Sequence, residues 1–361
     1  MLIAPDLLWL DGALRPDLAV RLERGVVVEV GPLGGAGPDL APHLLIPGPT
    51  DLQVNGGGGT MLNADPTPEG LSRIVAAHRG LGTGEVLATV ITDRPEVAEA
   101  AAEAVLAARV PGLLGLHLEG PHIAPERRGT HDPDRIRPLD ARTVRLVERL
   151  CAAGVPVMLT LAPERADPAL MRRMAAAGAV LSAGHSAASA AETRAALAEG
   201  VTCFTHLYNA MPPMTSRAPG LLGVAMVSDA FAGIIADGIH VDWDMVRLAL
   251  AARPPGRTFV VSDAMATVGG PGAFELYGRT IRLRDGALVN AEGSLAGAHV
   301  DMVTSLANLH RHAGVPLARA VAMATDIPRA AMRLPPRRIA GGLGAEWLTA
   351  LDANLHRTDL A

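Results

Sequence analysis

The feature that most constrains the fold is a series of short apolar runs, several of which end in a residue type that binds metal ions. Three runs end in Glu119, His185 and His206, and a fourth ends in Asp263. A continuous apolar run is typical of a strand that is buried on both faces of a parallel sheet. A buried carboxylate is costly without a partner, so Glu119 needs an arginine or a cation. Unlike strands that end in one carboxylate and two imidazoles indicate a metal site at one rim of a parallel barrel.

Apolar runs alternate with amphipathic, helix-like stretches along most of the chain. Eight buried strands are expected, near residues 46–54, 87–92, 113–119, 157–163, 180–185, 201–206, 231–237 and 258–263. Eight strands that alternate with helices predict an α/β fold of the (β/α)₈ TIM-like barrel type, with catalytic groups at the carboxyl ends of the strands. A doubly wound open sheet is the alternative. It is disfavoured because Gly56–Gly59 lacks the spacing of a dinucleotide-binding turn.

Both ends of the chain carry strand-like segments without the helical stretches of the central part. Residues 1–45 contain short strands separated by turns, and residues 335–361 return to a strand-like pattern. We expect these two segments to form one small, discontinuous β-sandwich domain, and residues 46–334 to form the barrel. Late in the barrel segment, a hairpin that turns at Asp285–Gly286 is expected to precede helices in 299–332.

Charge and composition exclude several classes of function. The net charge is −5 with both signs interspersed, so no basic face is expected to bind nucleic acid or an anionic membrane. All 32 basic residues are arginine, which excludes Schiff-base lysines, phosphate-binding Walker lysines and carboxylated lysines that bridge two metals. No apolar run approaches the roughly 20 residues of a membrane span, and the amino-terminal segment that begins Met1-Leu-Ile-Ala-Pro-Asp has no basic region followed by an apolar region, as a signal peptide would. We therefore expect a cytoplasmic protein, with Cys151 and Cys203 as free thiols.

The ligand-type residues predict a single catalytic metal ion. Glu119, His185 and His206 would leave one coordination position open for water, as in hydrolytic zinc sites. Gln53 and Asn55 lie two apart on the first barrel strand and face the same way. Many barrel metallohydrolases bind a second metal there with a His-x-His pair, and neutral amides are far weaker ligands. We expect one divalent ion, zinc first, with iron, cobalt or manganese as alternatives, and a water-mediated contact from Gln53. A simple turn is the alternative role for Asn55.

Other polar residues are candidates for proton transfer and substrate binding. Asp263 is expected to accept a proton from water whose pKa a metal lowers towards about 7, and a helix N-cap is its alternative role. Arg217 is the candidate phosphate clamp, because a guanidinium forms bidentate contacts with phosphate. His131, Asn209 and His240 lie in loops after the third, sixth and seventh strands, where substrate recognition belongs. Solvated surface is the alternative for each of these loop residues.

A series of motifs runs in order from about residue 45 to residue 300. The motifs are Pro47-Gly48, Asp51-x-Gln53-x-Asn55-Gly-Gly, His117-Leu-Glu119-Gly-Pro121, Gly129-Thr-His131-x-Pro133, Ala183-Gly-His185-Ser186, Thr205-His206-Leu-Tyr-Asn209-Ala-Met211, Pro219-Gly220, Asp237-Gly-x-His240 and Ser262-Asp263-Ala-Met. Each motif alone is weak, and the ordered set is specific. Together they resemble the N-acetylglucosamine-6-phosphate deacetylases of the amidohydrolase superfamily.

The resemblance implies an activity and a set of roles. The activity is hydrolysis of the acetamide of N-acetyl-D-glucosamine 6-phosphate to glucosamine 6-phosphate and acetate, in amino-sugar catabolism. Glu119, His185 and His206 would bind one divalent metal, Asp263 would be the catalytic acid and base, and His131 would polarise the acetyl carbonyl. The implied substrate contacts are Thr130, His131, Asn209, Ala210, His240, Arg217, Leu295, Ala296 and Gly297. The resemblance also implies a homodimer in which Arg217 reaches the neighbouring subunit's site.

Three alternatives to this activity stay open. The chain departs from the family pattern at His122, where an apolar residue is expected, and at Ala298, where serine is common. These departures concern substrate preference, so deacetylation of the galactosamine epimer is one alternative. Hydrolysis of another cyclic amide, or deamination of a base, on the same barrel is the second. The third is a sugar-phosphate-binding homologue without activity, whose mark would be loss of ligand-type residues that are all present here.

Overall fold

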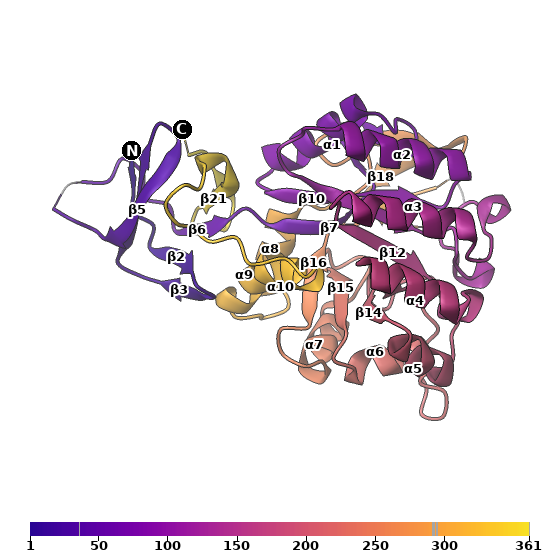
Figure 1. Ribbon diagram of the computed structural model, residues 1–361. Coiled ribbons are helices and arrows are strands. Elements are labelled where there is room, and N and C mark those ends of the chain that lie inside the picture. The colour runs from indigo at the N-terminus through magenta and orange to yellow at the C-terminus, as the bar shows by residue number, and fades with distance from the viewer. Residues whose placement is uncertain (36, 291–292, 294, 361) are drawn as a thin grey trace.

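The main body of the protein is a parallel barrel of eight strands, seen in a computed structural model that describes residues 1–35, 37–290, 293 and 295–360 (Figure 1). Each strand pairs with the next one along the chain. The strands are β7 (Thr50–Val54), β10 (Glu85–Ile91), β11 (Leu113–Glu119), β12 (Val157–Leu161), β13 (Val180–Ala183), β14 (Val201–Phe204), β15 (Phe231–Ile235) and β16 (Thr258–Val261). The predicted TIM-like barrel is therefore confirmed.

Helices cover the outside of the barrel (Figure 1). They are α1 (Pro68–Gly80), α2 (Pro95–Ala107), α3 (Ala141–Ala152), α4 (Pro168–Ala177), α5 (Ala190–Ala198), α6 (Gly220–Val227), α7 (Trp243–Ala252), α8 (Met302–Arg311), α9 (Leu317–Ala324) and α10 (Asp326–Ala331). Helix α3 illustrates the pattern: the Asp140 side chain accepts from Thr143 N at 2.9 Å, and Val144, Val147 and Leu150 are buried. A capped helix with one apolar stripe packs that stripe against the sheet.

The predicted strand boundaries need two corrections. The strand expected at 46–54 is two strands, because Leu44–Pro47 (β6) pairs outside the barrel and the first barrel strand begins at Thr50. The other strands mostly end one or two residues earlier than expected. His185, His206 and Asp263 therefore lie just after their strands and not within them. The seam between β7 and β16 is joined by a bridge between Val54 and Ala264, and by hydrogen bonds from Ser262 to the Asp51 carboxylate.

A second, smaller body is built from strands at both ends of the chain and lies beside the barrel (Figure 1). One sheet contains β1 (Leu2–Ile3), β4 (Leu18–Glu23) and β5 (Val26–Pro32), and the other contains β22 (Arg357–Thr358), β21 (Leu348–Leu351), β6, β2 (Leu7–Leu10) and β3 (Ala13–Arg15). Ile3, Val20, Leu45 and Ala350 share one buried apolar cluster. The small discontinuous sheet domain is thus present, and the boundaries at residues 45 and 335 stay a prediction.

An antiparallel sheet lies over the carboxyl ends of the barrel strands. Its strands are β17 (Ala273–Leu276), β18 (Arg279–Arg284), β19 (Ala287–Val289) and β20 (Leu295–Ala298), and a separate short pair is β8 (Gly56–Gly57) with β9 (Thr60–Met61). The hairpin predicted to turn at Asp285–Gly286 is confirmed as β18 and β19. Phe274 packs with Ile91 and Met265 beneath it. The hairpin therefore closes one side of the barrel mouth.

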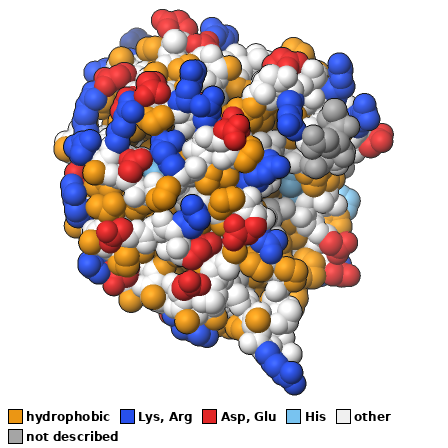
Figure 2. Space-filling view, turned by 90° about the vertical axis from the view of Figure 1, so that its right-hand side faces the viewer, with side chains coloured by type: hydrophobic (Ala, Val, Ile, Leu, Met, Phe, Trp, Pro, Cys, Tyr) orange, Lys and Arg blue, Asp and Glu red, His pale blue; other side chains and the backbone are white. Residues whose placement is uncertain are grey.

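Two expectations from composition concern the surface and the cysteines. Figure 2 shows acidic and basic side chains interspersed over one face of the molecule. Among the residues that the structure describes, no helix is long and apolar enough to cross a membrane. Cys151 and Cys203 are both free, as expected.

Candidate active site

Four buried side chains converge where the barrel strands end. Glu119 is the last residue of β11, while His185, His206 and Asp263 each follow a strand by two residues. The backbone of the latter three is left-handed, with φ values of 47°, 26° and 52°. Such a conformation is unfavourable for residues other than glycine, and it is concentrated at functional sites. The barrel therefore holds these side chains in place at a cost in backbone strain.

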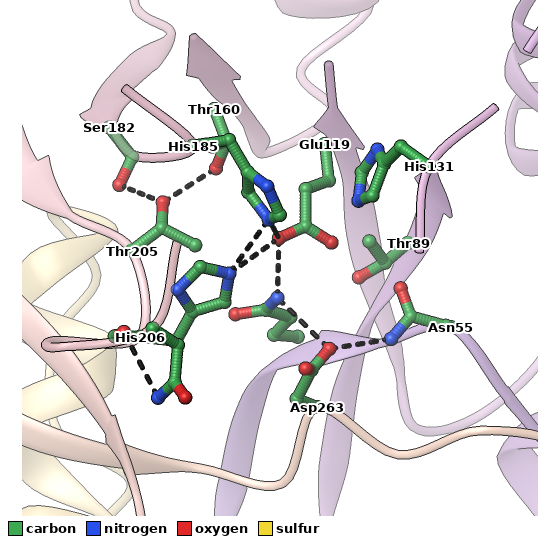
Figure 3. A network of polar contacts seen from close by, with 12 residues as sticks. Asn55, Thr89, Glu119, His131, Thr160, Ser182, His185, Thr205, His206 and Asp263 are labelled. Carbon is green, nitrogen blue, oxygen red and sulfur yellow. Dashed lines mark hydrogen bonds and ion pairs between the residues drawn. The ribbon is translucent and has the colours of Figure 1, made fainter. Parts of the chain in front are cut away.

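Glu119, His185 and His206 each direct one potential metal-ligand atom at the other two (Figure 3). The Oε1 atom of Glu119 lies 3.1 Å from Nε2 of His206 and 3.3 Å from Nε2 of His185, and the two Nε2 atoms are 3.0 Å apart. Ligands at zinc distances of about 2.0–2.1 Å in tetrahedral geometry are separated by about 3.3–3.4 Å. The three atoms thus form a triangle close to the size that one zinc-like ion requires.

Hydrogen bonding at the far side of the rings supports a cation rather than an ordinary contact. The Nδ1 atom of His185 donates to the carbonyl of Arg127 at 2.8 Å, so its Nε2 carries a lone pair in the neutral ring. Nδ1 of His206 is buried and has no hydrogen-bond partner among the described residues. Two imidazole nitrogens and a carboxylate oxygen at this separation are stabilised by a shared positive charge. The donor set therefore fits a divalent metal ion.

The site perturbs the pKa values of its acidic groups in opposite directions. Burial alone raises the pKa of Glu119, but the hydrogen bonds and charges of His185 and His206 outweigh it and hold that pKa well below its usual value. Burial, followed by the charge of Glu119, raises the pKa of Asp263 to about 6. One carboxylate is thus kept ionised, while its neighbour can exchange a proton near neutral pH.

Two amide side chains bind the carboxylates, and one of them, Gln53, connects Glu119 with Asp263. Figure 3 labels the other, Asn55, beside Asp263. The Nε2 group of Gln53 donates to Oε1 of Glu119 at 2.8 Å and to Oδ1 of Asp263 at 3.0 Å. Asn55 Nδ2 donates to the same Oδ1 atom at 2.7 Å. Oδ1 of Asp263 therefore accepts two amide hydrogen bonds, which leaves Oδ2 for chemistry. Asn55 thus binds a carboxylate of the site and does not form a simple turn. The amide nitrogen of Gln53 faces the two carboxylates. Its water-mediated contact with the metal stays a prediction.

A cavity of about 190 Å³ opens beside these groups. Its lining includes predicted substrate contacts from separate loops and from β20, namely Thr130, His131, Asn209, Ala210, His240, Leu295 and Gly297. Two predicted contacts lie elsewhere. Ala296 is buried in the apolar cluster beneath the hairpin, because adjacent strand residues face opposite ways. Arg217 is exposed on the loop 212–219, and the described residues that line this cavity do not include it.

His131 is held by Thr92, a residue outside the sequence motifs of the site. Its Nδ1 atom is hydrogen-bonded to Oγ1 of Thr92 at 2.7 Å, and burial lowers the pKa of its ring to about 3, so the ring is neutral. Donor atoms of Glu119, His131 and His185 lie within 4.8 Å of one another. The set with His206 is tighter, so we treat His131 as a substrate contact. Thr92 is the last residue of the predicted strand 87–92, and this position at the end of a barrel strand is the sequence feature that could have marked it as a site residue.

Two further histidines have clear partners. His117 lies in the barrel core below Glu119, where Nδ1 donates to the carbonyl of Leu52 at 3.1 Å and Nε2 accepts from Thr160 at 2.8 Å. Burial lowers the pKa of His117 to about 4. At the rim of the cavity, His240 Nδ1 donates to Asp237 Oδ2 at 2.6 Å. His117 is therefore a structural residue, and the orientation of His240 is fixed by its neighbouring carboxylate.

The chain is similar to known proteins over most of its length. The amidohydrolase family model matches residues 44–337. The chain is 39% identical over 310 residues to the N-acetylgalactosamine-6-phosphate deacetylase of Shewanella sp. (strain ANA-3), covering 84% of this chain and 78% of that protein. It is 33% identical over 307 residues to the N-acetylglucosamine-6-phosphate deacetylase of Haemophilus influenzae, covering 83% and 80%. A mutant of the Mycobacterium smegmatis N-acetyl-D-glucosamine-6-phosphate deacetylase, solved with N-acetyl-D-glucosamine-6-phosphate, superposes with a TM-score of 0.86 at 31% identity, covering 99% and 96%.

Proposed function

The chain belongs to the amidohydrolase family, and we propose that it is a metal-dependent deacetylase of N-acetylated amino-sugar 6-phosphates. The observation that carries the proposal is the cluster of Glu119 Oε1, His185 Nε2 and His206 Nε2, mutually separated by 3.0–3.3 Å, beside Asp263. A hydrolase of an unactivated amide needs an electrophile, a proton carrier and a water-restricted pocket. The relatives named above are amino-sugar phosphate deacetylases, which supports this substrate class.

Glu119, His185 and His206 would hold one divalent ion, and we propose zinc because two imidazoles and a carboxylate are ligands that zinc prefers. The ion, when bound, supplies a Lewis acid for the acetyl carbonyl and lowers the pKa of a water molecule. Gln53 and Asn55 occupy the place where a second set of strong ligands would stand. Their amide nitrogens donate to carboxylates, which supports one ion per subunit rather than two.

The side chains of the site then divide the proton transfers of amide hydrolysis. Asp263 takes a proton from the attacking water at Oδ2, since Oδ1 is engaged by Gln53 and Asn55. The water oxygen bonds to the acetyl carbon, and His131 donates a hydrogen bond to the negative charge that develops on the carbonyl oxygen. Asp263 delivers its proton to the sugar nitrogen as the C–N bond breaks. Acetate and a free amine are the products.

The identity of the sugar epimer separates two candidate substrates. N-acetyl-D-glucosamine 6-phosphate is the substrate that the resemblance favours, and the galactosamine epimer is favoured by the relative at 39% identity. The two sugars differ only in the orientation of the 4-hydroxyl group. Asn209 and His240 line the cavity from separate loops and are candidates for contacts with the sugar. We propose the glucosamine derivative as the main substrate.

The phosphate group has no arginine among the described residues that line the cavity. Arg217 lies on the exposed loop 212–219, which projects beyond α5 and α6 (Figure 1). Large apolar side chains are exposed on the neighbouring loops and helices, namely Met214, Val227, Ile239, Met245 and Leu248. We propose that this face packs against a second copy and places Arg217 at the partner's cavity. Light scattering should give the mass of a dimer, and Arg217→Ala should raise KM much more than it lowers kcat.

Acetate release from both epimers tests the proposed activity. Zinc-loaded protein is incubated with each N-acetylated sugar 6-phosphate, and acetate and free amine are measured together. We expect both products in equal amounts, with a higher kcat/KM for the glucosamine derivative. A higher kcat/KM for the galactosamine derivative would reverse the assignment of the epimer. Ammonia from a base or ring opening of a cyclic amide, without acetate from either sugar, would contradict the deacetylase.

A further inference from the structure

Thr92 stands at the junction of the catalytic loop and the hairpin that covers the barrel mouth. It directly follows β10 and is fully buried. Two of its polar groups bind different segments: Oγ1 is hydrogen-bonded to Nδ1 of His131 at 2.7 Å, and its carbonyl accepts a hydrogen bond from the hydroxyl of Tyr277. We propose that Thr92 is a positioning residue that fixes the tautomer of His131 so that the proton lies on Nε2. This proposal rests on the proposed deacetylase function.

The direction of the hydrogen bond follows from the number of partners. A threonine hydroxyl has one hydrogen, and a buried hydroxyl hydrogen needs an acceptor. Within the part of the chain that the structure describes, Nδ1 of His131 is the partner of Thr92 Oγ1 and no second acceptor is present. If Nδ1 carried the proton instead, the hydroxyl hydrogen would be buried without a partner. Thr92 therefore donates to Nδ1, and the neutral ring carries its proton on Nε2.

This tautomer is the one that amide hydrolysis needs. His131 lines the catalytic cavity together with Glu119 and Asp263. An Nε2–H group donates to the oxygen of the acetyl carbonyl, where negative charge develops during attack by water. The opposite tautomer would present a lone pair to that oxygen and would repel the developing charge. Thr92 thereby acts on the reaction without touching the substrate, since it is not among the described residues that line the cavity.

The surrounding backbone leaves space for the Thr92 hydroxyl and for little else. Gly120, which follows β11, has a φ of 81°, and a Cβ atom added there would lie 2.3 Å from Oγ1 of Thr92. A side chain at this position would displace the hydroxyl from His131. The residue after Glu119 is therefore glycine for two reasons, because it adopts a left-handed conformation and because it allows this close approach.

The second contact of Thr92 extends its role to the hairpin. Tyr277 lies between β17 and β18, has a φ of 51°, and donates its hydroxyl to the Thr92 carbonyl. Burial, together with nearby carboxylates, raises the pKa of Tyr277, so its hydroxyl stays protonated as a donor. Tyr277 and His131 also line a neighbouring cavity of about 320 Å³. The hairpin and His131 are thus both bonded to one residue, which fixes their relative position.

Two variants separate the donor role of Thr92 from a packing role. Thr92→Val keeps the shape and removes the hydroxyl, whereas Thr92→Ser keeps the hydroxyl. We expect Thr92→Val to lower kcat roughly 10- to 100-fold with little change in KM and bound zinc, because a transition-state donor is lost in part of the population. Thr92→Ser should stay within about threefold of the unchanged protein. The matched control is Thr143→Val, since Thr143 binds His122 at 2.9 Å outside the catalytic cavity and should leave kcat unchanged.

The tautomer itself is measured without reference to activity. Long-range ¹H–¹⁵N spectra of histidine-labelled, zinc-loaded protein distinguish protonation at Nε2 from protonation at Nδ1, and His131→Gln identifies the signal. We expect Nε2–H in the unchanged protein and in Thr92→Ser, and a mixture or Nδ1–H in Thr92→Val. An Nδ1–H signal in the unchanged protein overturns the proposal even if Thr92→Val does not fold. Unchanged kcat in folded Thr92→Val does so too. A correct tautomer without acetate release would refute the deacetylase function but not the role of Thr92.

Discussion

Replacement of Asp263 by asparagine isolates proton transfer from the geometry of the site. Oδ1 of Asp263 accepts from Gln53 at 3.0 Å and from Asn55 at 2.7 Å, and the amide oxygen of asparagine can accept both hydrogen bonds. Only the atom at the Oδ2 position changes, from a proton carrier to an amide NH₂. We therefore expect the cluster of Glu119, His185 and His206 to keep its metal.

The size of the expected effect follows from the two proton transfers assigned to one side chain. A positioned acid or base typically contributes about 10²–10⁴ in rate, and Asp263 serves in both directions. We expect kcat to fall by about 10³–10⁴, which corresponds to about 4–5 kcal/mol. In the metal-free protein stability should not fall, because burial raises the pKa of Asp263 to about 6 and the ionised carboxylate is therefore costly to bury at pH 7. The neutral amide removes that cost.

The assay combines three measurements on the same preparations. Acetate release gives kcat, elemental analysis gives bound metal, and thermal unfolding gives stability. The control is Asp326→Asn, a partly buried carboxylate that binds Trp9 at 3.1 Å away from the catalytic cavity and should retain kcat. A kcat for Asp263→Asn within tenfold of the unchanged protein would show that another group carries the proton. Loss of the metal would show that Asp263 is a ligand instead.

Three further predictions concern pH, the metal and the barrel seam. The kcat of the zinc enzyme should rise with pH as Asp263 loses its proton, with the acid limb at or below about pH 6 because the bound cation lowers this pKa further; a limb well above 6 would contradict the assignment. Dialysis against a chelator should abolish activity, and one equivalent of zinc should restore it. Glu119→Gln should bind zinc weakly. Two equivalents of zinc bound to the unchanged protein would refute the single-ion site. Burial raises the pKa of Asp51 from 3.8 to about 7, so its carboxyl contributes stability that is full below about 3.8 and lost as pH rises through 7. Asp51→Asn should therefore gain stability relative to the unchanged protein between pH 5 and pH 8 in urea unfolding, and a pH-independent difference would contradict this.

The elements of the barrel were predictable because their signals are local. The strand Glu85–Ile91 is buried along its whole length, and five of its seven residues are apolar, which is the local pattern of a strand buried on both faces. Helix α3 shows its cap and its apolar stripe within 13 residues. The boundary at Leu44–Pro47 was missed because an apolar run looks the same in the barrel and in a neighbouring sheet. Its pairing with Leu348–Leu351 on one side and with Leu7–Leu10 on the other assigns it to the small domain.

The sequence by itself determined which residue types arrive at the ends of the strands, because strand direction and alternation follow from local pattern. The closing of eight strands into a ring decided the rest. It brought Gln53 and Asp263, 210 residues apart, to 3.0 Å. It also turned Ala296 away from the cavity and brought Tyr277 to Thr92. Such contacts depend on strand register, backbone strain and packing across the barrel. These properties arise between distant segments, so no short segment of the chain can encode them alone.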